Sequence, residues 1–201
     1  MEFRHLGNTG LAVSRLCFGA LTIGPLQANL PLQTGAAVIR TALAAGVNFI
    51  DTAELYETYP YIRAACCDFP GVVIASKSYA YTYDGMRRSV ENACRAIGRD
   101  YIDIFLLHEQ SSRLTLAGHS DALAFLADAK RRGLVRAAGV STHSVDVVRA
   151  AAGMPAVDVI HPLFNLRGLG IADGTAADMA AAVAAAAAAG KGVYTMKALG
   201  G

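Results

Sequence analysis

The sequence is poor in aromatic and charged residues. Its 201 residues include no Trp, 8 Tyr and 7 Phe, and only 17% are charged, whereas 54% are hydrophobic. This apolar content excludes an intrinsically disordered chain, and the scarcity of rings predicts an aliphatic, alanine-rich core. The formal net charge of +2 is far below that of a nucleic-acid-binding domain, so no nucleic-acid partner is expected.

Long apolar runs and patterned cysteines are also missing. The longest apolar run, residues 179–189, is shorter than the roughly 20 residues that a membrane span needs. Charged residues at positions 2 and 4 stand where a signal peptide needs an apolar stretch. The 4 cysteines show neither metal-site nor disulfide spacing. We therefore expect a reduced, cytoplasmic protein with no metal and no membrane contact.

Short apolar segments alternate with helical patterns along the whole chain, and no linker divides it. The hairpin signal around Gly7-Asn8-Thr9-Gly10 predicts two short strands within residues 3–13. A left-handed glycine is expected to end each helix. One domain over residues 1–201 is expected, with strands at 16–20, 47–51, 72–77, 101–108, 135–140, 157–161 and 193–196, and helices at 34–45, 60–67, 84–97, 119–132, 144–152 and 175–189.

This alternation predicts a parallel sheet covered by helices, either open and doubly wound or closed as a barrel. The open form usually has a glycine-rich phosphate loop after its first strand, and residues 19–24 do not match one. A barrel places functional residues at the C-terminal ends of successive strands. Polar residues close four successive strands at Asp51, Lys77, His108 and Ser141, with intervals of 26, 31 and 33 residues. This spacing favours a (β/α)8 TIM-barrel type.

Four of these polar residues form a set suited to protonating an oxygen. Asp51, Lys77 and His108 end adjacent predicted strands, and Tyr56 follows in the loop after Asp51. A neighbouring ammonium lowers the pKa of a phenol, a carboxylate orients the ammonium, and an imidazole hydrogen-bonds a substrate oxygen. Each residue also has a structural interpretation: a helix N-cap, loop packing, a lysine reaching solvent, or a core histidine. Their joint placement favours carbonyl reduction.

The motifs around these residues resemble the aldo-keto reductase family. The matching stretches are Gly46-Val47-Asn48-Phe49-Ile50-Asp51-Thr52-Ala53 with Tyr56, Ile74-Ala75-Ser76-Lys77, Tyr101-Ile102-Asp103-Ile104-Phe105-Leu106-Leu107-His108, Gly139-Val140-Ser141 and Met196-Lys197-Ala198-Leu199-Gly200-Gly201. The resemblance runs from residue 3 to the last residue. It implies a (β/α)8 barrel with an N-terminal β-hairpin that reduces a small-molecule aldehyde or ketone with NADPH or NADH.

The resemblance also implies a role for each residue. Tyr56 would be the general acid, Lys77 would lower its pKa, Asp51 would hold Lys77, and His108 would orient the carbonyl. The nicotinamide would be held by four residues after the later strands, which are Ser141, Asn165, His161 and Met196. Two positions depart from the family pattern, because Ser141 is followed by Thr142-His143 rather than Asn, and His161 stands where Gln is frequent.

The predicted strand count falls short of the family's barrel. Seven parallel strands are expected where the family has eight, so the barrel is expected to be incomplete and to lack its last βα unit. Two open sheet edges need cover, which predicts a homo-oligomer or a complementing chain. The alternative to an active reductase is therefore a catalytically inactive or partner-dependent truncated barrel with a structural or regulatory role.

Overall fold

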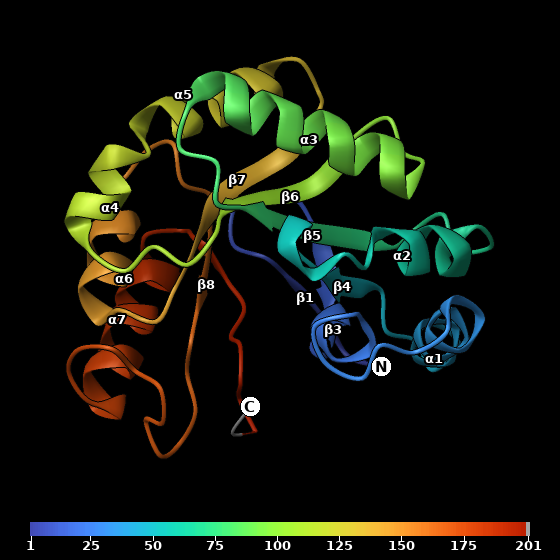
Figure 1. Ribbon diagram of the computed structural model, residues 1–201. Helices are drawn as coiled ribbons and strands as arrows, with labels where there is room; N and C mark the ends of the chain where they lie inside the picture. The colour runs from blue at the N-terminus through green and yellow to red at the C-terminus, as the bar shows by residue number, and fades with distance from the viewer. Residues whose placement is uncertain (200–201) are drawn as a thin grey trace.

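The computed structural model describes residues 1–199 and shows a curled parallel sheet (Figure 1). Its 7 strands are hydrogen-bonded in chain order, from β3 to β9, and every pair is parallel. This confirms the expected incomplete (β/α)8 barrel. The strands are β3 (Phe18–Gly19), β4 (Phe49–Asp51), β5 (Val73–Ser78), β6 (Ile102–Leu107), β7 (Val135–Thr142), β8 (Val159–Pro162) and β9 (Gly192–Val193).

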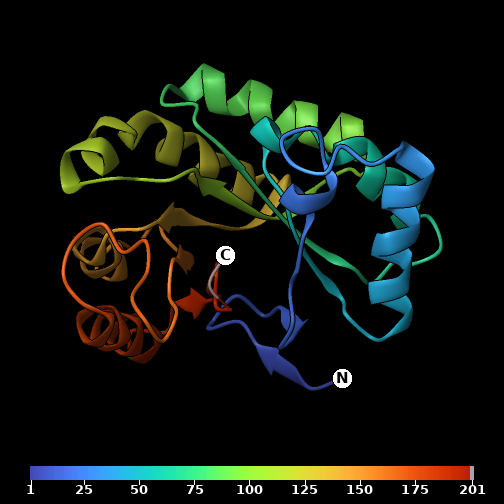
Figure 2. The same cartoon turned by 60° about the horizontal axis from the view of Figure 1, so that its bottom comes forward.

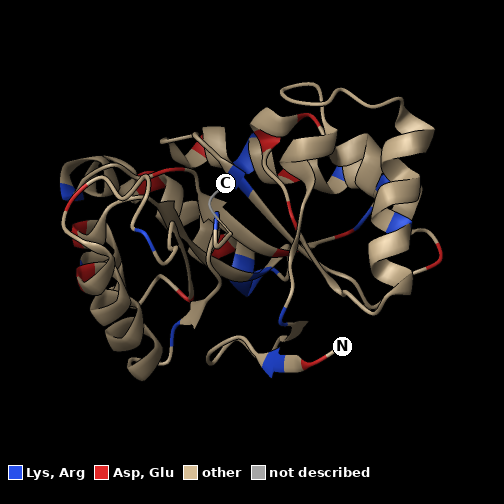
Figure 3. Cartoon of the chain, turned by 90° about the horizontal axis from the view of Figure 1, so that it is seen from below, with Lys and Arg blue, Asp and Glu red and all other residues tan. Residues whose placement is uncertain are grey.

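Helices cover the outer, convex face of this sheet (Figure 1). Along the chain, α1 packs on α2, α3 on α5, and α6 on α7. The helices are α1 (Leu32–Ala44), α2 (Tyr59–Cys66), α3 (Tyr83–Ile97), α4 (Arg113–Gly118), α5 (Ser120–Arg131), α6 (Val145–Ala152) and α7 (Ala176–Ala188), with short 3-10 helices η1 (Ala20–Ile23) and η2 (Glu54–Tyr56). In the view of Figure 3, basic and acidic residues are interspersed along the helices and loops.

The N-terminal hairpin lies across the bottom of the curled sheet. Strands β1 (Phe3–His5) and β2 (Ala12–Ser14) pair antiparallel, as predicted. The backbone N–H of Asn8 donates to the Gly190 carbonyl at 2.9 Å, and the two segments lie side by side in Figure 2. Gly7, at a φ of +52°, approaches so closely that an added Cβ would stand 2.3 Å from the Gly192 nitrogen. Only glycine fits this contact between the hairpin and β9.

The apolar side chains form two buried clusters, one on each face of the sheet. The larger lies between the sheet and its helices and is rich in Ala, Ile and Val. The smaller lies on the inner face, where Leu6 and Leu11 of the hairpin pack with Phe49, Ile104 and Leu106. The hairpin therefore closes the N-terminal end of the interior, and it leaves the polar C-terminal strand ends at the opposite end.

The structure corrects several predicted boundaries. Helix α4 was not expected; its first turn is fixed by Ser112 and Thr115, whose side chains each bond the other's backbone N–H. The expected strand 193–196 is shorter and earlier, as β9, and only the bridge from Met196 to Leu163 continues it. Left-handed glycines do not end every helix, because Cys67 after α2 and Gly153 after α6 are right-handed. Gly200 and Gly201 of the predicted motif lie outside the described residues.

Candidate active site

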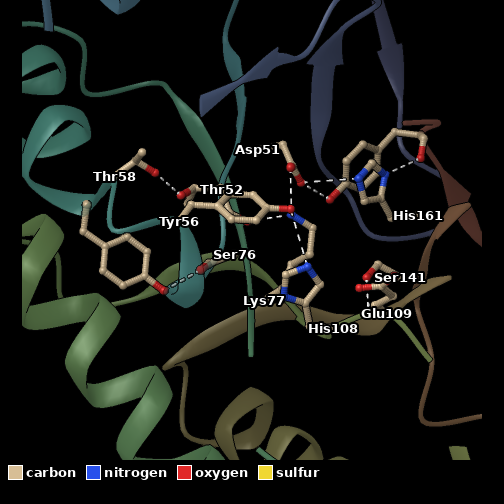
Figure 4. Close-up of polar contacts among 12 residues, drawn as sticks. Asp51, Thr52, Tyr56, Thr58, Ser76, Lys77, His108, Glu109, Ser141 and His161 are labelled. Carbon is tan, nitrogen blue, oxygen red and sulfur yellow. Dashed lines mark hydrogen bonds and ion pairs between the residues drawn. The ribbon is translucent and has the colours of Figure 1, made fainter. Parts of the chain in front are cut away.

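The C-terminal ends of β4, β5 and β6 bring Asp51, Lys77 and His108 together, as the strand-end rule predicts (Figure 4). Asp51 is the last residue of β4, Lys77 is the penultimate residue of β5, and His108 directly follows β6. Parallel register carries them to one rim, since Asp51 pairs with Ala75 and Lys77 with Leu106. Tyr56 ends the short helix η2 that follows β4 and leans over the same rim.

Asp51 and Lys77 form a buried ion pair. The Lys77 Nζ lies 2.7 Å from Asp51 Oδ2 and donates a second hydrogen bond of 2.7 Å to the Thr52 carbonyl. The Lys77 side chain is 1% exposed and the Asp51 side chain 12%, so little solvent screens the pair. Burial by itself would raise the pKa of Asp51, but the Lys77 ammonium, His161 and hydrogen bonds from Lys77 and Tyr194 bring it below its ordinary value. Asp51 is therefore a carboxylate at neutral pH.

Tyr56 lies between Lys77 and His108. Its hydroxyl is 3.4 Å from the Nε2 of His108, and the Lys77 Nζ stands 4.9 Å from the centre of its ring. Burial and the negative charge of Asp51 raise the pKa of Tyr56 above its ordinary value. The expectation of a lowered phenol pKa is therefore wrong for this structure. The physical reason is that the Lys77 ammonium is held by Asp51 and the Thr52 carbonyl rather than by the phenol oxygen.

His108 is a neutral imidazole at physiological pH. Burial and the positive charge of Lys77 lower its pKa to about 4. The Tyr79 ring stacks on it at 4.3 Å between ring centres, and the Tyr79 hydroxyl donates to Glu109 Oε2 at 2.5 Å. Within residues 1–199 the Nδ1 atom of His108 is buried with no hydrogen-bond partner. The stack fixes the ring so that Nε2 faces Tyr56.

The four predicted cofactor residues lie at the ends of β7, β8 and β9. The buried Ser141 Oγ accepts from the Glu109 N–H at 2.8 Å, and Met196 is partly buried beyond β9. His161 is 4% exposed, and its Nδ1 lies 2.8 Å from the Tyr194 carbonyl oxygen. Asn165 is engaged by its own loop, accepting from the N–H groups of Arg167 and Leu169 and donating to the Leu169 carbonyl.

Sequence reasoning missed Tyr194, whose hydroxyl donates to Asp51 Oδ1 at 2.8 Å. It also missed Tyr79 and Glu109, which surround His108.

Backbone conformation marks the site in a way that the sequence does not reveal. Of the four non-glycine residues with positive φ between residues 1 and 199, three directly follow Tyr56, His108 and Met196, and they are Glu57, Glu109 and Lys197. Such conformations cost free energy and cluster at functional sites.

No group of three or more His, Cys, Asp or Glu side chains in the described chain could hold a metal ion. The sequence pattern that defines the Aldo/keto reductase family matches residues 15–201, which is nearly the whole chain. The chain belongs to this family.

Known aldo/keto reductases resemble this member in sequence and in shape. The aldo-keto reductase YhdN of Bacillus subtilis is 26% identical over 183 residues, covering 83% of this chain and 54% of YhdN. The NADH-specific methylglyoxal reductase of Escherichia coli is 25% identical over 189 residues, covering 80% of this chain and 58% of that protein. The chain thus spans about half the length of the curated relatives it matches.

A solved structure of a candidate aldo-keto reductase from Pseudomonas aeruginosa superposes on this family member with a TM-score of 0.84. It is 28% identical, and the match covers 99% of this chain and 79% of that one. The curled sheet with its hairpin is therefore the family's fold. None of the helices within residues 1–199 is long and apolar enough to cross a bilayer.

Proposed function

We propose that this aldo/keto reductase chain reduces an aldehyde or ketone to an alcohol with NADPH or NADH, and that Tyr56 is the general acid. The observation that carries the proposal is the arrangement of Tyr56 between a buried ion pair and a neutral imidazole at one rim of the sheet. The name of the Escherichia coli relative, which includes a carbonyl substrate and NADH, points in the same direction.

In this proposal the four residues divide the work of protonating the substrate oxygen. The raised pKa keeps Tyr56 protonated at neutral pH, so the phenol holds its proton until a neighbouring oxygen gains negative charge. The Lys77 ammonium, 4.9 Å from the ring, then stabilises the phenolate that forms. His108 donates a hydrogen bond from Nε2 to the same oxygen and so fixes the position of the carbonyl next to Tyr56.

A nicotinamide cofactor fits the polar groups at the later strand ends. Ser141 is 1% exposed and its Oγ accepts from Glu109, so its own proton is available to a carboxamide oxygen. His161 is the register partner of Ser141 on the next strand, β8, and Met196 would supply an apolar side chain for the ring. Asn165 would have to leave its loop contacts. When bound, the reduced nicotinamide supplies the hydride that the carbonyl carbon receives.

The experiment is an assay of the 201-residue chain with an aromatic aldehyde and each cofactor. We expect turnover by the natural chain, and a loss of at least about 10²-fold in Tyr56→Phe, because phenylalanine keeps the ring but has no proton to give. Tyr61→Phe is the matched control, since Tyr61 is also a buried tyrosine, but its hydroxyl donates to the Leu30 carbonyl rather than to a residue of the site. Equal activity of Tyr56→Phe and the natural chain would overturn the proposal.

One observation favours the alternative of a partner-dependent or structural barrel. Strands β3 and β9 are the outer strands of the described sheet, and each is two residues long. A complementing chain or a second copy would cover these edges. Under this alternative the purified chain gives no change in NADPH fluorescence until the partner is added, or sediments as an oligomer. A monomer that binds NADPH tightly excludes it.

A further inference from the structure

The carboxylate of Asp51 is held on both sides, and only one of its partners belongs to the four proposed catalytic residues. Lys77 bonds Oδ2 at 2.7 Å, while the Tyr194 hydroxyl donates to Oδ1 at 2.8 Å. Tyr194 directly follows β9, 143 positions along the chain from Asp51. The curl of the sheet therefore brings its last strand, β9, back to the end of β4. This hydrogen bond links the end of β4 to the end of β9.

The ring of Tyr194 is held in place by aromatic contacts. It stacks on His161, with ring centres 3.9 Å apart and planes 15° apart, and it meets the Phe49 ring edge-on at 4.8 Å. The Tyr194 carbonyl oxygen lies 2.8 Å from the Nδ1 of the same His161. These two aromatic contacts and the hydrogen bond to Oδ1 together hold the Tyr194 hydroxyl toward Asp51.

We propose that Tyr194 is a positioning residue, which acts through Asp51 to keep the Lys77 ammonium over the face of the Tyr56 ring, 4.9 Å from its centre. This inference rests on the proposed function, since it assigns Lys77 the task of stabilising the Tyr56 phenolate. With Oδ1 occupied by Tyr194, only Oδ2 is available to Lys77, and the direction of the ammonium is fixed. Without the hydroxyl, Asp51 can turn and offer either oxygen, and it draws Lys77 more strongly because no neutral donor shares its charge.

The charged and titratable groups around Asp51 come from five elements. Lys77 faces it from β5 and His161 from β8, its Nε2 being 3.7 Å from Oδ1. The partly buried Cys17, just before β3, lies close by, and the charge of Asp51 also reaches Tyr56 after β4 and His108 after β6. Among the residues that the structure describes, Lys77 from this set and Tyr194 after β9 hydrogen-bond the carboxylate through their side chains.

The test compares Tyr194→Phe with the control Tyr61→Phe, which removes a tyrosine hydroxyl that donates to the Leu30 carbonyl rather than to a residue of the site. In ¹³C-aspartate-labelled protein, we expect the pKa of Asp51 to rise by about one pH unit in Tyr194→Phe and to stay constant in Tyr61→Phe. In the same variant, kcat for carbonyl reduction falls about tenfold with KM little changed, and the alkaline limb of the pH profile of kcat moves to higher pH. A merely structural tyrosine would lower the amplitude of the profile without moving it.

A double variant supplies the decisive comparison. If Tyr194 acts through Asp51, adding Tyr194→Phe to Asp51→Asn causes no further loss of kcat, whereas independent action gives the product of the two losses. An unmoved Asp51 pKa, or independent losses, overturns the inference. The NMR titration needs no turnover, so a chain that lacks reductase activity refutes the proposed function alone.

Should Tyr194→Phe not fold, the natural chain supplies its own measurement. A slowly exchanging Tyr194 hydroxyl proton is expected, and its magnetic coupling across the hydrogen bond to the Asp51 carboxylate can be detected in labelled protein. The absence of that proton overturns the inference.

Discussion

The ends of β4, β5 and β6 differ from the ends of β7, β8 and β9 in how their polar side chains are satisfied. In the first region, side chains contact one another across strands, as Asp51, Lys77, Tyr56 and His108 do. In the second region they bond mainly to the backbone, as Ser141, His161 and Asn165 do. The first region is thus organised by its own charges before any ligand binds. A ligand in the second region must use the donors and acceptors that the backbone leaves free, or displace a backbone contact.

The largest expected effect comes from Lys77→Met, which removes the cation from the first region. Asp51 then stays buried without its ion-pair partner, so the free energy of unfolding falls by about 3–5 kcal/mol. Carbonyl reduction falls by at least about 10²-fold, because nothing stabilises the Tyr56 phenolate. Urea denaturation and steady-state kinetics measure the two losses.

The double variant Asp51→Asn with Lys77→Met separates stability from catalysis. Replacing both partners leaves no buried charge, so most of the lost stability returns, while activity stays absent. Recovered activity in the double variant would mean that the ion pair is structural only, and the contrast between the two regions would lose its functional meaning.

The second prediction concerns pH and uses one histidine from each region. Burial lowers the pKa of His108 and of His161 to about 4, while an unfolded histidine titrates near 6.5. Between these values the unfolded chain binds more protons, so stability is complete above about pH 6.5 and is lost as the pH falls toward 4. The loss is on the order of 2–3 kcal/mol for each histidine, and Asp51, whose folded pKa is lowered from an ordinary value near 4, adds its own loss only at lower pH.

Urea denaturation between pH 4.5 and 7.5, a range of about three units, tests this dependence. His161→Gln and His108→Gln each remove about half of the slope, and the exposed His5→Gln leaves it unchanged. A slope that survives in both buried variants would contradict the prediction. If the slope disappears in only one of these two variants, the histidine that remains in that variant is charged in the folded chain. Water then reaches that histidine more than its burial indicates.

The sequence predicts the first region better than the second for a physical reason. Asp51, Lys77 and His108 each end a buried apolar run, and local patterning is enough to find a strand end. Tyr194 cannot be found in this way, because it stands in an apolar segment and its partner is 143 positions away. The raised pKa of Tyr56 was also beyond local patterning, since it depends on which acceptors hold Lys77 in the folded chain.

The smallest expected effect compares two predicted cofactor residues within the second region. Within residues 1–199 the Ser141 hydroxyl donates to no acceptor, whereas Asn165 is occupied by its loop. Ser141→Ala therefore weakens NADPH binding about tenfold, while Asn165→Ala changes it no more than about twofold. Asn165→Ala instead lowers stability by about 1–2 kcal/mol, because the N–H groups of Arg167 and Leu169 lose their acceptor. Calorimetric titration and urea denaturation of both variants give the two numbers for each. If Asn165→Ala weakens binding as much as Ser141→Ala, the loop must release Asn165 to the cofactor, and the second region is then rearranged by its ligand rather than prepared for it.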